Sequence, residues 1–343
     1  MTDPIYTAGR QPDFENMLRV LRRERPARPT LYEMSLHDAL VADLAGMPVQ
    51  AGESRLARLQ RQVTAFANAG YDYVIFGDWD FGFPIGEVHQ QASLSLNEGF
   101  VITDRDSFHA YPWTDPDDYD YSPLRDIAAE LPAGMKVIST GPYGVLENVI
   151  RLLGYENLCL LLLDDPALVG EVFDAVGSRM LAHYRLTASM PAVGACISSD
   201  DWGFKTQPML SPADMRQYVV PWHARIVEAI HAAGKPAILH SCGQLSALMD
   251  DIIDTIGYDG KHSNEDTIQP VEAAYDQYHA RIAVLGGIDV DFLCRATPEA
   301  ITARSRAMLA HAPTGYALGT GNSVPPYVPT ASYLAMLDAA VRE

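Results

Sequence analysis

The chain has little positive charge for its length. Among 343 residues, 25 are Lys or Arg and 44 are Asp or Glu, which gives a formal net charge of −19. Proteins that bind nucleic acid neutralise phosphates with clustered Lys and Arg. The one basic run, residues 22–25, is typical of the solvated end of a helix. We therefore expect no nucleic-acid partner.

Long apolar runs and paired cysteines are also missing. The apolar run that stands out, residues 158–163, is far shorter than the ~18 residues that cross a bilayer. The first residues lack the basic patch and apolar stretch of a secretory signal. Four cysteines with no CxxC pair do not form a disulfide framework. These absences predict a soluble, cytoplasmic protein that does not bind a membrane.

Apolar residues are plentiful, at 48% of the chain, which is enough for a large core. Eight short runs rich in Val, Ile, Leu and Tyr alternate with helical patterns. They are residues 30–35, 71–77, 136–140, 193–198, 236–240, 258–261, 281–286 and 315–319. Such alternation favours parallel strands in a closed (β/α)8 TIM barrel, and no GxGxxG motif supports an open sheet. We predict an α/β fold with a single barrel domain over residues 1–343.

The helical segments carry clear end signals. Residues 54–69 place apolar side chains at helical spacing and precede Gly70, a residue suited to ending a helix. Ser211-Pro212 and Thr297-Pro298 each join an N-capping hydroxyl to a proline at the first helical position. Helices are therefore expected to begin at these two places.

One stretch, residues 78–130, breaks the alternation. Short alternating runs flank Glu98-Gly99, which predicts a β-hairpin within an insertion after the second strand. In a barrel the insertion emerges at the C-terminal face, where it serves either as a lid or as a surface or dimer contact. Its aromatic residues predict that it is buried, against the barrel or across a homodimer interface. They are Phe81, Phe83, Phe100, Phe108, Tyr111 and Trp113.

Polar side chains gather where the predicted strands end, which is where TIM barrels place their active sites. His240 and Cys242 stand two residues apart, so on an extended strand end they share a face and can supply two ligands to zinc. Asp200 and Asp201 follow another strand. They can serve as a base, a metal ligand or a substrate anchor, or they can be turn residues. His262 and Glu265 follow the next strand after His240.

Several segments together resemble the uroporphyrinogen decarboxylase superfamily, from about residue 29 to the C-terminus. They are Gly141-Pro142-Tyr143-Gly144, Asp200-Asp201-Trp202-Gly203, His240-Ser241-Cys242-Gly243, Gly286-Gly287-Ile288-Asp289 and Gly321-Asn322-Ser323. The resemblance implies a (β/α)8 barrel. It also implies one of two chemistries, because the superfamily contains cofactor-free decarboxylases and zinc-dependent methyltransferases that exchange methyl groups with a corrinoid.

The second branch fits better. True uroporphyrinogen decarboxylases hold substrate carboxylates with an arginine-rich segment, and the matching residues 31–38 contain no arginine. A substrate with many carboxylates is also repelled by a strongly acidic protein. The methyltransferases bind zinc with an HxC motif and a late cysteine. His240 and Cys242 match the motif, whereas Asn322 stands at the place of the late cysteine.

The resemblance therefore implies a zinc-dependent methyltransferase that moves a methyl group between a small molecule and a corrinoid protein. Cobalamin would be carried by that separate partner, and relatives suggest a homodimer. The metal ligands are His240 and Cys242. The catalytic candidates are Asp201, His262 and Glu265, and zinc can recruit any one of them as a further ligand. Candidate substrate-binding residues are Glu33, Tyr143, Asp200, Asp289 and Asn322. Two alternatives remain: a metal-independent decarboxylase or lyase of a smaller carboxylated substrate, and a non-catalytic small-molecule-binding barrel.

Overall fold

The core of the protein is a curled parallel sheet of seven strands. The computed structural model describes residues 3–77, 81–88 and 95–342, and the strands follow one another in the order β1 to β7, each paired in parallel with the next. They are β1 (Tyr73–Phe76), β2 (Lys136–Thr140), β3 (Val193–Ser199), β4 (Ala237–His240), β5 (Gly260–His262), β6 (Ala283–Leu285) and β7 (Tyr316–Ala317). Seven of the eight predicted strands are therefore confirmed.

The first predicted strand, residues 30–35, is reduced to a bridge beside β7. Tyr32 N donates to Leu318 O at 2.7 Å, and Leu318 N donates to Thr30 O at 2.8 Å. On its other side, the Tyr73 hydroxyl accepts from Glu33 N and donates to Glu33 O. The Tyr73 side chain is thus hydrogen-bonded to the backbone N–H and C=O of Glu33, which pairing with β1 would need. Within the described residues the sheet is a half-barrel of TIM type, where the sequence predicted closure.

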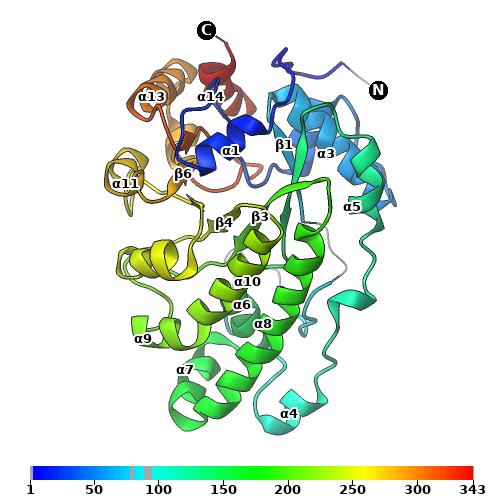
Figure 1. The fold of residues 1–343 in the computed structure, drawn as a ribbon, viewed down its shortest axis with the longest axis vertical. Coiled ribbons are helices and arrows are strands. Elements are labelled where there is room, and N and C mark those ends of the chain that lie inside the picture. The colour runs from blue at the N-terminus through cyan, green and yellow to red at the C-terminus, as the bar shows by residue number, and fades with distance from the viewer. Residues whose placement is uncertain (1–2, 78–80, 89–94, 343) are drawn as a thin grey trace.

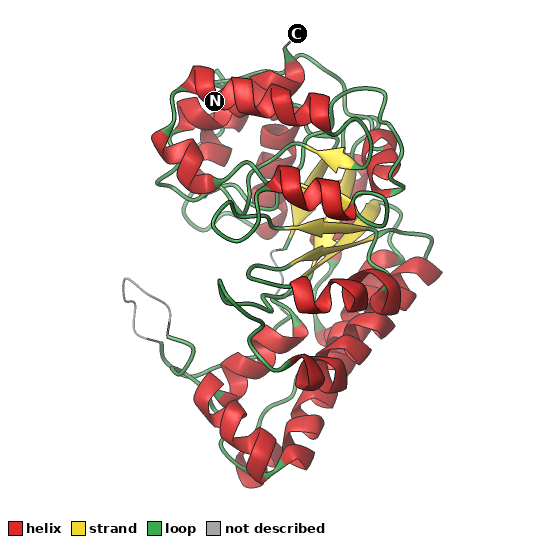
Figure 2. Ribbon diagram, turned by 90° about the vertical axis from the view of Figure 1, so that its left-hand side faces the viewer, coloured by secondary structure: helices red, strands yellow, loops and turns green. Residues whose placement is uncertain are grey.

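Helices surround this sheet (Figures 1 and 2). They are α1 (Glu15–Leu21), α2 (Asp38–Ala45), α3 (Arg55–Ala69), α4 (Arg105–Ala110), α5 (Ser122–Asp126), α6 (Val145–Leu153), α7 (Tyr155–Asp164), α8 (Pro166–Ala188), α9 (Pro212–Asp214), α10 (Val220–Ala232), α11 (Val271–Tyr278), α12 (Val290–Arg295), α13 (Pro298–His311) and α14 (Thr330–Val341). A π-helical segment, Met215–Val219, joins α9 to α10. Within the described ranges, no helix has the length and apolar content to cross a membrane.

The predicted helix ends are confirmed. Ser54 caps α3 by accepting from Ala57 N, and Gly70 ends that helix with a φ of 91°, which a residue without a side chain adopts freely. Ser211 and Thr297 likewise accept hydrogen bonds from backbone groups at the starts of α9 and α13. Local capping chemistry was therefore sufficient to place these ends.

The segment between β1 and β2 holds α4, α5 and short 3-10 turns, with no strand among its described residues. The hairpin predicted around Glu98-Gly99 includes residues 89–94, which lie outside the described residues, so it stays a prediction. Beside them Gly86 N donates to Gly99 O at 2.7 Å. Of the aromatic residues there, Phe81, Phe83 and Tyr111 are buried, and the Phe81 ring stacks on His183 of α8. Phe100 remains exposed.

Candidate metal centre

Three side chains that can bind a metal meet where β3 and β4 end. They are Asp201, His240 and Cys242, whose ligand atoms lie within 4.8 Å of one another, and no other such group of three occurs in the part of the chain that the structure describes. His240 Nε2 lies 3.8 Å from both Cys242 Sγ and Asp201 Oδ1. The parallel register pairs Ser199 of β3 with His240 of β4, so the residues that follow the two strands are brought together.

This donor set fits zinc. A tetrahedral zinc ion holds nitrogen at about 2.1 Å and sulfur at about 2.3 Å, which puts neighbouring ligands about 3.5 Å apart. The two 3.8 Å distances from His240 Nε2 need a shift of only a few tenths of an ångström, and the remaining pair, Asp201 and Cys242, lies within 4.8 Å. Burial, with Asp201 nearby, raises the pKa of the Cys242 thiol to about 12. A divalent cation would reverse this effect, because it stabilises the thiolate.

A hydrogen-bonded chain fixes which nitrogen His240 presents. Thr320 O can only accept, and it lies 3.0 Å from His262 Nε2, so that nitrogen carries a proton. His262 Nδ1 is then an acceptor for the proton on His240 Nδ1, 2.8 Å away. His240 Nε2 is consequently left with its lone pair, directed at Asp201 and Cys242. Burial lowers the pKa of His240 to about 3 and that of His262 well below its usual value, so both rings are neutral.

His262 is therefore an orienting residue. It is fully buried, so it does not reach a substrate, and this position argues against the direct catalytic role that its place at a strand end predicted. Metal-binding histidines commonly have such a partner on the second ring nitrogen.

The place of the expected late cysteine is taken by an amide that faces the thiol. Asn322 Nδ2 donates to Cys242 Sγ at 3.3 Å, and Ser263 Oγ donates to the same sulfur at 3.6 Å. Asn322 also lines a large cavity. The amide thus stabilises negative charge on the sulfur and does not add a second thiolate to the site.

Glu33, predicted to bind substrate, is fully buried behind the site. Its Oε1 lies 2.8 Å from Thr320 Oγ1, which also lies 2.8 Å from Asn322 O. The Thr320 hydroxyl has one proton, so it can donate to only one of these two oxygens. Both contacts are satisfied if Thr320 donates to Asn322 O and a protonated Glu33 donates to Thr320 Oγ1. Burial indeed raises the pKa of Glu33 to about 8. Glu33 therefore fastens the first segment to the end of the sheet, and its predicted role in substrate binding stays a prediction.

Asp200 and Asp201 are neighbours in sequence with different surroundings. Asp200 is fully buried, and its oxygens accept from Leu146 N, Glu147 N and His223 Nε2, each at 2.9 Å. Asp200 thus holds the start of α6, which favours a structural role over the predicted substrate contact. Asp201 accepts from Cys242 N at 2.9 Å, and its side chain remains 36% exposed.

The two remaining substrate-binding candidates lie outside the metal group. Asp289 caps α12, with one oxygen accepting from Asp291 N and Phe292 N and the other from Asp266 N. Tyr143 lies in an exposed turn after β2, with the Arg151 guanidinium 4.0 Å from the centre of its ring. The structure therefore gathers Asp201, His240, Cys242 and Asn322 around one point.

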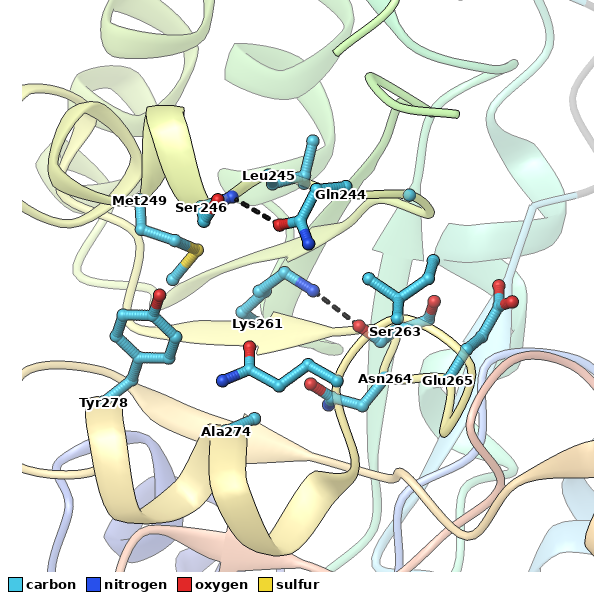
Figure 3. A pocket seen from close by; sticks show the side chains of 13 residues that line it. Gln244, Leu245, Ser246, Met249, Lys261, Ser263, Asn264, Glu265, Ala274 and Tyr278 are labelled. Atoms are coloured by element: carbon cyan, nitrogen blue, oxygen red, sulfur yellow. Dashed lines mark hydrogen bonds between the residues drawn. The ribbon is translucent and has the colours of Figure 1, made fainter. Parts of the chain in front are cut away.

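Two cavities adjoin the centre and share Glu265. The larger, of 1060 Å³, includes Asn322 and Lys205 in its lining. The smaller, of 40 Å³, surrounds Lys261 of β5 (Figure 3). Burial raises the pKa of Glu265. Glu265 thus lines both cavities, and its catalytic role stays a prediction.

Sequence reasoning missed three residues of this region. Lys261 lies directly before His262, and a charged residue inside a strand was the available signal. Glu147 follows the Gly141–Gly144 motif, and burial together with Asp200 and Asp201 raises its pKa to about 8. Thr320 has no local signal, because its role depends on contacts with Glu33 and His262.

The chain is similar in sequence to known uroporphyrinogen decarboxylases. A family model described as uroporphyrinogen decarboxylase (URO-D) matches residues 118–343. Two curated uroporphyrinogen decarboxylases, from Anaeromyxobacter dehalogenans (strain 2CP-C) and Anaeromyxobacter sp. (strain Fw109-5), are each 25% identical over 202 residues. These matches cover 58% of this chain and 56% of each relative, so the chain spans little more than half the length of those relatives.

One solved structure, a methyltransferase from Methanosarcina mazei, superposes with a TM-score of 0.70. The match covers 95% of this chain and 97% of that chain, at 14% sequence identity. At that identity the likeness establishes a shared fold.

Proposed function

The chain belongs to the uroporphyrinogen decarboxylase family, and on that premise we propose that it is a zinc-dependent methyltransferase. Asp201, His240 and Cys242 hold the metal, and the observation that carries the proposal is the convergence of these three donors within 4.8 Å. The methyl group moves between a small molecule and a corrinoid protein, with cobalamin on that partner.

The charge around the large cavity supports this choice over porphyrinogen decarboxylation. Four carboxylates line it, whereas Lys205 and Arg295 are its cationic residues. The carboxylates belong to Glu265, Asp266, Asp289 and Asp291. A substrate with many carboxylates would be repelled there, because charges of one sign in a cleft strengthen each other's field. A methyl compound that carries few negative charges is repelled much less.

Each residue of the centre has a separate task. Zinc, when bound, is a Lewis acid that lowers the pKa of a thiol or hydroxyl group at its open coordination position. His262 holds His240 in the tautomer that presents Nε2, and Asn322 donates a hydrogen bond to the Cys242 sulfur. Glu265 faces the approach from both cavities and exchanges protons with the small molecule.

The large cavity is the proposed approach for the corrinoid. Its lining includes Tyr327, whose side chain is exposed, so a partner protein can reach it from solvent. We also propose that two copies of the chain form a homodimer, as the sequence resemblance implied. Light scattering and co-purification with a corrinoid protein test these two partners separately.

Metal content and methyl transfer test the function. Protein purified without chelator is expected to hold about one zinc per chain, and to methylate added cob(I)alamin from a methyl donor. Cys242→Ala should remove both properties, whereas Cys159→Ala, in α7, should keep both because Cys159 lies outside the metal group. Less than about a tenth of an equivalent of zinc in the unmodified protein would count decisively against the proposal.

A carboxy-lyase is the alternative that these measurements also detect. Two carboxyl groups near the centre, Glu147 and Asp201, have a raised pKa because of burial, which makes each a better proton donor than an ordinary carboxyl group. Turnover that persists in EDTA and in Cys242→Ser would favour this metal-independent chemistry.

A further inference from the structure

Lys261 is a lysine of β5 whose charged form is favoured by the nearby carboxylates of Asp201 and Glu265, without a direct ion pair to either. It is partly buried on β5, and Ser263 O is its one hydrogen-bond acceptor among the described residues. It forms no ion pair with any carboxylate that the structure describes. Burial accordingly lowers the pKa of its ammonium group to about 8. An ammonium group removed from water is normally paired with an anion.

The cavity around Lys261 is polar on the side where the ammonium lies. Figure 3 shows the Lys261 side chain between Gln244 on one side and Asn264 on the other. Ser246 and Gln269 add a hydroxyl and an amide to the lining, and apolar side chains complete it. The amide groups can donate to an anion beside the ammonium, whereas the apolar residues exclude water.

The size of this cavity limits the anion. A water molecule needs about 10–15 Å³ of such space, so 40 Å³ holds a group about as large as a carboxylate. A carboxylate fits this space more closely than a bulkier phosphate does. The planar carboxylate also accepts from an ammonium and an amide at once.

The cavity adjoins the metal centre through Ser263. Its carbonyl accepts from Lys261, and its hydroxyl donates to Cys242 Sγ at 3.6 Å. Gly243, which follows Cys242 in the chain, and Glu265 also line the cavity. A carboxylate bound here is therefore held beside the atoms that would bind zinc.

We propose that the Lys261 cavity is a subsite for the carboxylate group of the small molecule that reacts at the metal centre. The reaction of this molecule at the metal rests on the proposed function, whereas binding of its carboxylate does not. The substrate class is then a small carboxylic acid whose reactive end points from Lys261 toward Cys242.

Acetate is the probe that tests binding. In titration calorimetry and thermal melting of metal-free protein, acetate should bind and raise the melting temperature, whereas chloride at equal ionic strength should not. Lys261→Met should weaken acetate binding at least tenfold, and Lys261→Arg should keep part of it. Lys136→Met is the matched control, because Lys136 lies at the start of β2 and lines neither cavity. Equal binding by Lys261→Met, or an equal effect of chloride, would overturn the subsite.

A second measurement needs no variant. The chain has four lysines, at 136, 205, 235 and 261, so mass spectrometry can follow each one during reductive methylation with formaldehyde and a borane. Acetate should slow the modification of Lys261 and leave Lys136 and Lys235 unchanged. A Lys261 rate that acetate does not alter would contradict the proposal even if Lys261→Met failed to fold.

Zinc-loaded and EDTA-treated protein separate this proposal from the proposed function. Acetate binding in EDTA-treated protein supports the subsite whether or not zinc is a cofactor. Acetate binding that appears only with zinc would show that the anion binds the metal, and it would overturn the Lys261 subsite while supporting a metal centre.

Discussion

Two layers of polar side chains meet at the C-terminal ends of the strands, and they differ in how their hydrogen-bonding groups are used. An inner layer is fully buried and bonded to other parts of the protein: Glu33, Asp200, His223, His262 and Thr320. An outer layer is partly exposed and faces the cavities or the metal donors: Asp201, Cys242, Lys261, Glu265 and Asn322. The inner layer therefore sets geometry, and the outer layer is available for ligands.

Asp200 and Asp201 are adjacent in the chain but belong to different layers. Successive residues of an extended chain point to opposite sides, so one carboxylate enters the core beside α6 and the other faces His240 and Cys242. Substitutions should reproduce the division, with losses of stability in the inner layer and losses of ligand binding in the outer layer.

The largest expected contrast is between these two aspartates. Asp200→Ala removes the acceptor of His223 and of two backbone N–H groups at the start of α6. Breaking a buried, hydrogen-bonded pair should lower the free energy of unfolding by about 3–5 kcal/mol. Asp201→Ala should lower it by less than ~1 kcal/mol but weaken zinc binding. Urea denaturation and zinc titration measure the two effects, and equal losses of stability would remove the distinction between the layers.

A smaller effect should appear in the pH dependence of stability through Glu33. Its pKa rises from 4.5 to about 8 on folding, so between these values the native state keeps a proton that the unfolded state has released. Its contribution is complete below the unfolded pKa and is lost as pH rises toward the folded pKa. From pH 5 to pH 7, one such proton lowers the free energy of unfolding by about 2–3 kcal/mol.

Glu33→Gln keeps a donor for Thr320 Oγ1 but does not titrate. Its free energy of unfolding, measured in urea at pH 5 and pH 7, should fall less than that of the unmodified protein by about that amount. Glu147, whose pKa burial also raises, is present in both proteins, so the difference isolates Glu33. Parallel pH profiles would mean that Glu33 is already ionised in the folded state.

The smallest predicted change concerns His262, where the inner layer acts on the outer one. His262→Ala removes the acceptor that orients His240, and loss of such a partner typically costs 10- to 100-fold in metal affinity. His262→Asn should recover part of the loss, because its amide oxygen can accept from His240. Competition with a chelating dye measures the zinc dissociation constant. An unchanged constant in His262→Ala would assign the orientation of His240 to other contacts.

Much of the fold was predictable because the signals are local. The alternation of short apolar runs with capped helices identified seven strands, and Ser54, Ser211 and Thr297 begin helices as expected. The opening of the barrel was not predictable. It depends on the Tyr73 hydroxyl reaching the backbone of Glu33, 40 residues away in the chain.

The sequence by itself determined the strand-end position of His240 and Cys242 and their shared face, because a two-residue spacing in an extended chain leaves no other choice. Only the tertiary structure decided which polar residues near them are available to a ligand. Glu33 and Thr320 are 287 positions apart in the chain, yet they share a hydrogen bond in the core. Lys261 and His262 are neighbours in the chain, yet Lys261 lines a cavity and His262 is fully buried. Burial and the supply of hydrogen-bond partners are set by segments that meet only on folding, so no local pattern encodes them.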